Sequence, residues 1–166
     1  MRLSKLSLLV ASMWYASSVN AAKLPFETYA FTEIEIGIEN NDAGQALNGF
    51  GRCMGTMLVI SWSDLRSEYE GDNPNSEINL AYKGLAWGAL FQQFFYKGLK
   101  DEEMTTEKAK AMYAEADEAA SYYAEAYLAW LERDGTSVEN LDEYHPFMIE
   151  LDKCMEVGSA LNKSRS

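Results

Sequence analysis

The sequence predicts an all-α protein: an up-down-up-down four-helix bundle stapled by one disulfide, preceded by a short extended or irregular arm. Four long segments repeat apolar residues at spacings of three and four. Clusters of Asn, Asp, Gly and Pro separate these segments, and the only two cysteines fall on the first and the last of them. The 166 residues suit one domain. We expect a signal peptide over residues 1–21, the arm over 22–42, the bundle over 43–161 and a polar tail over 162–166.

The first residues have the three-part layout of a secretory signal peptide. Arg2 and Lys5 precede an apolar run over residues 6–19, and small residues follow at Ala21 and Ala22. We expect cleavage after Ala21, with a cut after Ala22 as the next choice; an uncleaved membrane anchor is the alternative. Cleavage removes two positive charges from a net charge of −12, which gives −14. The mature protein is then exported to a compartment that permits disulfides, the periplasm for a Gram-negative source and the exterior otherwise.

Residues 22–42 are the least regular part of the mature chain. Within them, residues 33–39 alternate apolar and polar side chains, which is typical of a β-strand. No later segment offers a second strand, and a lone strand is not stable in water. We therefore expect an arm that lies on the helices. A short helix, or pairing with a partner or a second copy, is the alternative.

The first bundle helix is expected over residues 43–70, after the turn cluster at residues 40–42. Its middle is apolar nearly all round, which predicts burial on several sides. Arg52 is the exception, and we expect it to turn away from the core. Gly51 and Gly55 lower the helix propensity, so we expect a neighbouring helix to approach closely there.

The second helix is expected over residues 76–100 and the third over 106–133. The second is the most apolar element and therefore the central one. The third begins at Thr105 or Thr106, a residue type that caps helix starts, and ends at Gly135. It carries alanines on its core face and an acidic stripe on its outer face.

The last helix is expected over residues 146–161, because Pro146 fits only the first turn of a helix. In the predicted bundle, the first and last helices are antiparallel neighbours. Cys53 and Cys154 then lie at depths that agree to within about 5 Å, at 1.5 Å of rise per residue. We expect these two cysteines to form a disulfide. A site for a soft metal such as Cu(I) is the alternative, with sulfur ligands from Cys53, Met54, Met57, Cys154 and Met155.

Several chemistries lack the residues that they need. His145 is the only histidine, so zinc sites with two or three imidazoles and di-iron bundles are excluded. No Gly-x-Ser-x-Gly elbow, glycine-rich phosphate loop or Cys-x-x-Cys motif is present. We expect no catalytic residue, no metal and no cofactor, and we expect His145 to be a surface or helix-capping residue.

The acidity of the chain disfavours nucleic acid and anionic lipid as partners. We expect a protein that acts in the cell envelope by binding another protein, as an inhibitor, an immunity protein or a chaperone, and a homodimer is an option. In architecture alone, the layout is similar to that of acid-stress chaperones and of immunity proteins. A small-molecule or soft-metal binder is the alternative, and an enzyme comes third. The acidic residues expected to meet the partner are Glu33, Glu35, Glu115, Glu118, Glu125 and Glu132.

Overall fold

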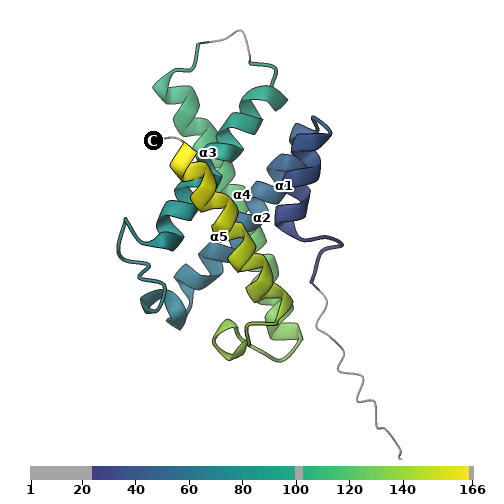
Figure 1. Cartoon of the computed structure of the whole chain (residues 1–166), viewed down its shortest axis with the longest axis vertical. Coiled ribbons are helices and arrows are strands. Elements are labelled where there is room, and N and C mark those ends of the chain that lie inside the picture. The colour runs from purple at the N-terminus through teal and green to yellow at the C-terminus, as the bar shows by residue number, and fades with distance from the viewer. Residues whose placement is uncertain (1–23, 100–102, 165–166) are drawn as a thin grey trace, which may run out of the picture.

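The computed structural model describes residues 24–99 and 103–164, and this part of the chain is all-helical, with five α-helices and no strand (Figure 1). The helices are α1 Ala30–Glu39, α2 Ala43–Trp62, α3 Glu77–Tyr96, α4 Thr106–Arg133 and α5 Pro146–Ser164. Two short 3-10 helices, η1 Asp64–Ser67 and η2 Val138–Asn140, follow α2 and α4. The predicted signal peptide, residues 1–21, lies outside the described residues and stays a prediction.

The segment predicted as an extended or irregular arm contains helix α1, so the extended arm is wrong for residues 30–39 and the alternative of a short helix is confirmed. Ala30, Ile34 and Gly37 are buried at spacings of four and three, which is the spacing of one helix face. A Cβ atom built on Gly37 would collide with the backbone of Ala46 on α2. Close packing of α1 on α2 therefore buries this face, whereas a strand would have had no partner. Within the described part of the arm, residues 24–29 ahead of α1 and residues 40–42 after it are not helical.

Helix α2 is shorter than the sequence indicated. It ends at Trp62 because Ser63 is extended, with φ −102° and ψ 171°. The hydroxyl of Ser63 then accepts a hydrogen bond from the backbone of Leu65 and caps the 3-10 helix η1. The predicted start of α4 at Thr106 is confirmed, with Thr105 as its cap, and so is the start of α5 at Pro146.

The helices pack as α3 against α5 and α2 against α4, while α2 also contacts α1, α3 and α5. The up-down-up-down bundle is not confirmed, because such a bundle would make the consecutive helices α4 and α5 close neighbours and they have few contacts here. At the crossing of α3 with α5, a Cβ built on Gly84 would overlap the carbonyl oxygen of Gly158. The two backbones touch at this point, so neither glycine leaves room for a side chain.

Beyond the crossing, the end of α3 and the start of α4 extend past the other helices, at the top of Figure 1. This end of the molecule carries several partly exposed aromatic residues of α3. Within residues 24–99 and 103–164, no helix is both long and apolar enough to cross a bilayer.

Candidate functional site

The predicted disulfide is confirmed: Cys53 on α2 is bonded to Cys154 on α5, with 5.2 Å between their Cα atoms. Both cysteines are fully buried. The alternative of a soft-metal site needed their two thiolates, which the disulfide consumes. In the described part of the chain, no group of three or more His, Cys, Asp or Glu side chains is placed to hold a metal ion.

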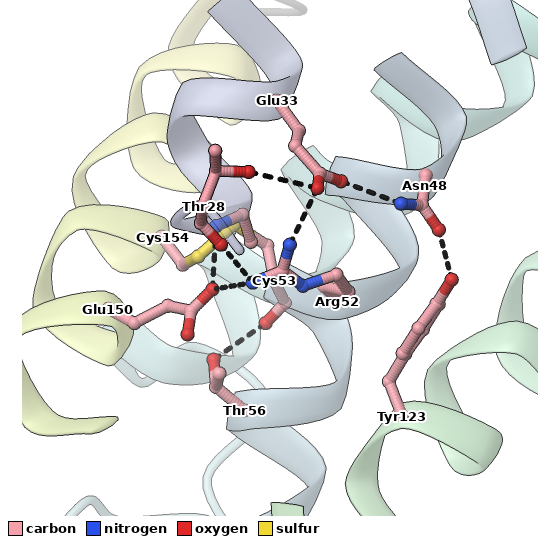
Figure 2. A network of polar contacts seen from close by, with 10 residues as sticks. Thr28, Glu33, Asn48, Arg52, Cys53, Thr56, Tyr123, Glu150 and Cys154 are labelled. Atoms are coloured by element: carbon pink, nitrogen blue, oxygen red, sulfur yellow. Dashed lines mark hydrogen bonds and ion pairs between the residues drawn. A yellow bond between two sulfur atoms is a disulfide. The ribbon is translucent and has the colours of Figure 1, made fainter. Parts of the chain in front are cut away.

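The residue beside Cys53 reverses one prediction. Arg52 does not turn away from the core; its side chain is completely buried. Its Nη2 lies 2.9 Å from Oε1 of Glu150, which is also fully buried, and its Nη1 lies 2.8 Å from Oε1 of Glu33. Nη2 also donates a hydrogen bond of 2.7 Å to the carbonyl oxygen of Thr28 (Figure 2). One guanidinium thus joins α1, α2, α5 and the segment ahead of α1.

The segment ahead of α1 closes over this cluster. The ring of Phe26 lies 4.1 Å from the guanidinium carbon of Arg52, a cation–π contact. The backbone amide of Ala30 donates a 2.6 Å hydrogen bond to Oε1 of Glu150. Burial raises the pKa of Glu150, although Arg52 and this amide act in the opposite direction. Burial likewise raises the pKa of the neighbouring Tyr127 well above its ordinary value. We conclude that the buried charges hold the fold together and are closed to a partner.

The six acidic residues predicted to meet a partner fall into three situations. The carboxylate of Glu33 is bound inside the molecule, since it accepts from Arg52, from the hydroxyl of Thr28 and from the amide of Asn48 (Figure 2). Glu115 pairs with Lys97 of α3, with Nζ 2.7 Å from both carboxylate oxygens. Exposed carboxylates remain at Glu35 on α1 and at Glu118, Glu125 and Glu132 on α4.

These exposed acids do not form one cluster. Helix α1 packs against α2 and α5, so Glu35 lies apart from the stripe on α4. That stripe follows the outer face of α4 at spacings of seven residues, which is typical of a solvated helix face. The stripe alone therefore gives no site with a defined shape.

A shaped hollow lies elsewhere, between the α1–α2 turn and the second half of α3. It has a volume of about 460 Å³ and is lined by Gly37, Ile38, Asn41, Ala43, Phe91, Gln92 and Phe95. Three of its lining side chains are large, apolar and about half exposed: Ile38 at 51%, Phe91 at 45% and Phe95 at 42%. We call this hollow and its rim the aromatic groove.

The aromatic wall of the groove is built by the helical repeat of α3. Trp87, Phe91 and Phe95 follow one another at intervals of four residues, which places them on one face. The rings of Trp87 and Phe91 stack at 5.8 Å, and those of Phe91 and Phe95 meet edge-on at 4.7 Å. On the opposite wall, the α1 face that carries Ile38 also carries Glu35 one turn earlier.

The single histidine caps a helix, which confirms one of its two predicted roles. Nδ1 of His145 accepts a hydrogen bond of 3.2 Å from the backbone amide of Phe147 in the first turn of α5. Its ring lies 5.3 Å from that of Trp130. Burial lowers the pKa of His145, although Asp142 and Asp134 act in the opposite direction. The neutral imidazole is the form that can accept the hydrogen bond.

This cap makes the stability depend on pH. Since the pKa of His145 is lower in the folded chain, the unfolded chain binds the proton more readily. The contribution of the His145 cap to the free energy of unfolding is therefore complete at pH values above about 6.5, the ordinary histidine pKa. It is lost as the pH falls through the pKa that His145 has in the folded chain. We expect the free energy of unfolding, measured with urea, to decrease as the pH is lowered from 7.5 to 5.5. The decrease should be smaller for His145→Asn than for the unaltered protein, because asparagine can cap the helix but does not titrate. Equal slopes would contradict this role.

No family model matches the chain, and neither a curated protein nor a solved structure matches it.

Proposed function

We propose that this protein is an exported binding protein that holds a partner protein in the aromatic groove. The observation that supports it most is the gathering of three half-exposed apolar side chains, Ile38, Phe91 and Phe95, around one hollow. Single exposed apolar residues are ordinary on a protein surface. A contiguous apolar patch with polar residues at its rim is typical of an interaction site.

The charges around the groove indicate the chemistry of the partner. Glu35 and Glu39 flank Ile38 on α1, and the whole chain carries a net charge of −12. A partner with apolar anchors and nearby Lys or Arg side chains would complement both features. An amphipathic helix with a basic polar face meets this description, and such helices bind by laying their apolar face in a groove. A second copy of this chain would bring like charges together, so we favour a different, basic protein.

Export is part of the same proposal. The layout of residues 1–22 and the Cys53–Cys154 disulfide both suit a protein that works outside the reducing cytosol. An inhibitor, an immunity protein and a chaperone all act through such a surface and need no catalytic residue. The acidic stripe of α4 would then contribute long-range attraction, which steers a basic partner toward the protein.

The groove can be tested with a defined probe, a helical peptide of Leu and Lys with one apolar face. We expect this peptide to bind the oxidised protein, and Phe91→Asp to weaken binding about tenfold or more, as for the loss of a buried aromatic anchor. The matched control is Tyr144→Asp, because Tyr144 is 77% exposed and lies outside the groove. Affinities would be measured by calorimetry, with circular dichroism to confirm that both variants are folded.

The direction of the effect separates groove binding from general attraction between opposite charges. Each variant adds one negative charge, so unspecific attraction would make both bind the cationic peptide as tightly as the unaltered protein or tighter. Loss of binding in Phe91→Asp alone would support the groove. Equal affinities for the two variants, or equal binding of a Leu and Glu peptide, would reject it.

A further inference from the structure

A second hollow lies where the end of α2 meets the end of α4 and the 3-10 helix η2, near the bottom of Figure 1. Its volume is about 510 Å³, which is within the range typical of sites for small molecules. The aromatic groove includes Ala43, the first residue of α2, whereas this hollow includes Trp62, the last one. The two share no lining residue, so each can be altered separately. We call the second one the Trp62 hollow.

The Trp62 hollow offers an apolar surface that is open to solvent. Leu131 and Val138 are buried and form part of its lining, while Trp62 is 51% exposed and Leu128 is 37% exposed beside them. A ligand can therefore reach the indole ring without any movement of the chain. Two exposed side chains give too little area for a stable protein interface, which buries about 800 Å² on each partner. They suit an organic molecule of the size of a single ring.

Two carboxylates give this hollow a negative charge. Glu132 and Glu139 both line it, and both are exposed. Oε1 of Glu139 accepts a hydrogen bond of 3.3 Å from the backbone amide of Asp64, two residues after Trp62, so this carboxylate lies near the end of α2. Hydrogen bonds from its own backbone and from Ser137 lower the pKa of Glu139, which is therefore ionised at neutral pH.

Neither carboxylate has a cationic partner in the part of the chain that the structure describes. No Lys or Arg among these residues lines the Trp62 hollow, and neither Glu132 nor Glu139 forms an ion pair with any of them. The face of a tryptophan ring also attracts cations, more strongly than that of tyrosine or phenylalanine. The ring and the two carboxylates therefore favour a ligand of the same charge.

We propose that the Trp62 hollow binds a small organic cation, an apolar body that carries one ammonium group. The ammonium group lies between the indole ring and Glu139, and the apolar body covers Leu128 and the buried lining. The ring and the lining supply affinity for the apolar body, while the carboxylates select its charge. This activity goes beyond the proposed function, because it needs neither the aromatic groove nor a protein partner.

Benzylammonium, benzyl alcohol and benzoate form a matched set of probes, since they have similar shapes and are positively charged, neutral and negatively charged. We would titrate each into the isotope-labelled, oxidised protein and follow the amide signals and the indole signal of Trp62. Benzylammonium should give saturable shifts at Trp62 and Val138, and benzoate should bind most weakly. We expect an affinity about fivefold above that of benzyl alcohol, the combined effect of an exposed cation–π contact and an exposed ion pair. No saturable shift at these residues, or equal affinity for benzylammonium and benzyl alcohol, would overturn the proposal.

Two variants with the same change of charge locate the effect. Glu139→Gln should reduce the preference for benzylammonium over benzyl alcohol, and glutamine retains an oxygen for the amide of Asp64. Glu118→Gln is the matched control, because Glu118 is exposed on α4 and lies outside the hollow, and it should leave the preference unchanged. Equal effects of the two variants would show that the overall negative charge attracts the cation, and would reject the site.

A change of the ring tests the cation–π contact. Trp62→Leu should lower the affinity for benzylammonium about threefold, because leucine has no ring face, and an unchanged affinity would count against the site. Displacement of benzylammonium by the Leu and Lys peptide would assign the hollow to a protein partner instead. Phe91→Asp should leave benzylammonium binding unchanged, so failure here and failure of the groove are distinguishable.

Discussion

Replacing Arg52 by methionine should lower the free energy of unfolding by about 3–5 kcal/mol, the cost typical of removing one member of a buried ion pair. Methionine fills most of the arginine volume but leaves Glu150 buried without its cation. It also removes the donor to the carbonyl of Thr28 and the ion partner of Glu33. Urea unfolding followed by circular dichroism at neutral pH would measure the change.

A double variant tests the reason for this loss. Arg52→Met combined with Glu150→Gln removes both buried charges, and glutamine retains an oxygen for the amide of Ala30. We expect it to be more stable than Arg52→Met alone, because an uncompensated charge is the main penalty. The exposed Lys153–Glu156 pair provides the control, and Lys153→Met should change stability little. A double variant less stable than the single one would show that packing and not charge is decisive.

Removing the disulfide should have an effect of similar size. Cys53 and Cys154 are 101 residues apart in the chain, and the loop-entropy treatment gives about 4–5 kcal/mol for a loop of about this length. Cys53→Ala combined with Cys154→Ala should lose close to that amount in urea unfolding. The same loss is expected for the unaltered protein after reduction.

The reduced protein and the double alanine variant serve as controls for each other. Agreement between them would assign the loss to the crosslink. A much larger loss in the alanine variant would indicate packing of the buried sulfurs instead. A change under about 1 kcal/mol in both would contradict the entropic origin of the stabilisation.

Local signals predicted a large part of the fold from the sequence. The start of α4 follows from Thr105, whose hydroxyl accepts from the amide of Lys108, and the start of α5 follows from Pro146. The disulfide followed from the positions of the only two cysteines on apolar helix faces. Each of these signals lies within a few residues of the feature that it determines.

Errors arose where distant residues decide the outcome. Residues 33–39 alternate as a strand would, but contact with Ala46 and Gly49 of α2 makes α1 a helix. Arg52 lies in an apolar stretch of α2, and no local pattern indicates its burial because its partner Glu150 is 98 residues away. Which helices pack against each other likewise depends on close crossings, such as that of Gly84 on α3 with Gly158 on α5. No local sequence pattern reveals such a crossing.

The aromatic groove was missed for a related reason. Phe91 and Phe95 belong to a helix that is apolar on most of its surface, so its sequence does not indicate which side remains uncovered. The exposed side depends on how far α3 extends beyond its neighbours, which is a property of the assembled fold (Figure 1). The burial of Gln93 on the same helix is also a property of the assembled fold, because its amide donates a hydrogen bond to the carbonyl oxygen of Met112 on α4.

The segment ahead of α1 sets a limit on trimming of the chain by peptidases. A cut after Ala21 or Ala22 spares Phe26, which covers Arg52, and Thr28, which binds it. An aminopeptidase that went on past Phe26 would expose the guanidinium to water and weaken its hold on Glu150. We therefore expect a fragment that begins after Phe26 to be less stable than one that keeps this residue, although Phe26 lies ahead of the first helix.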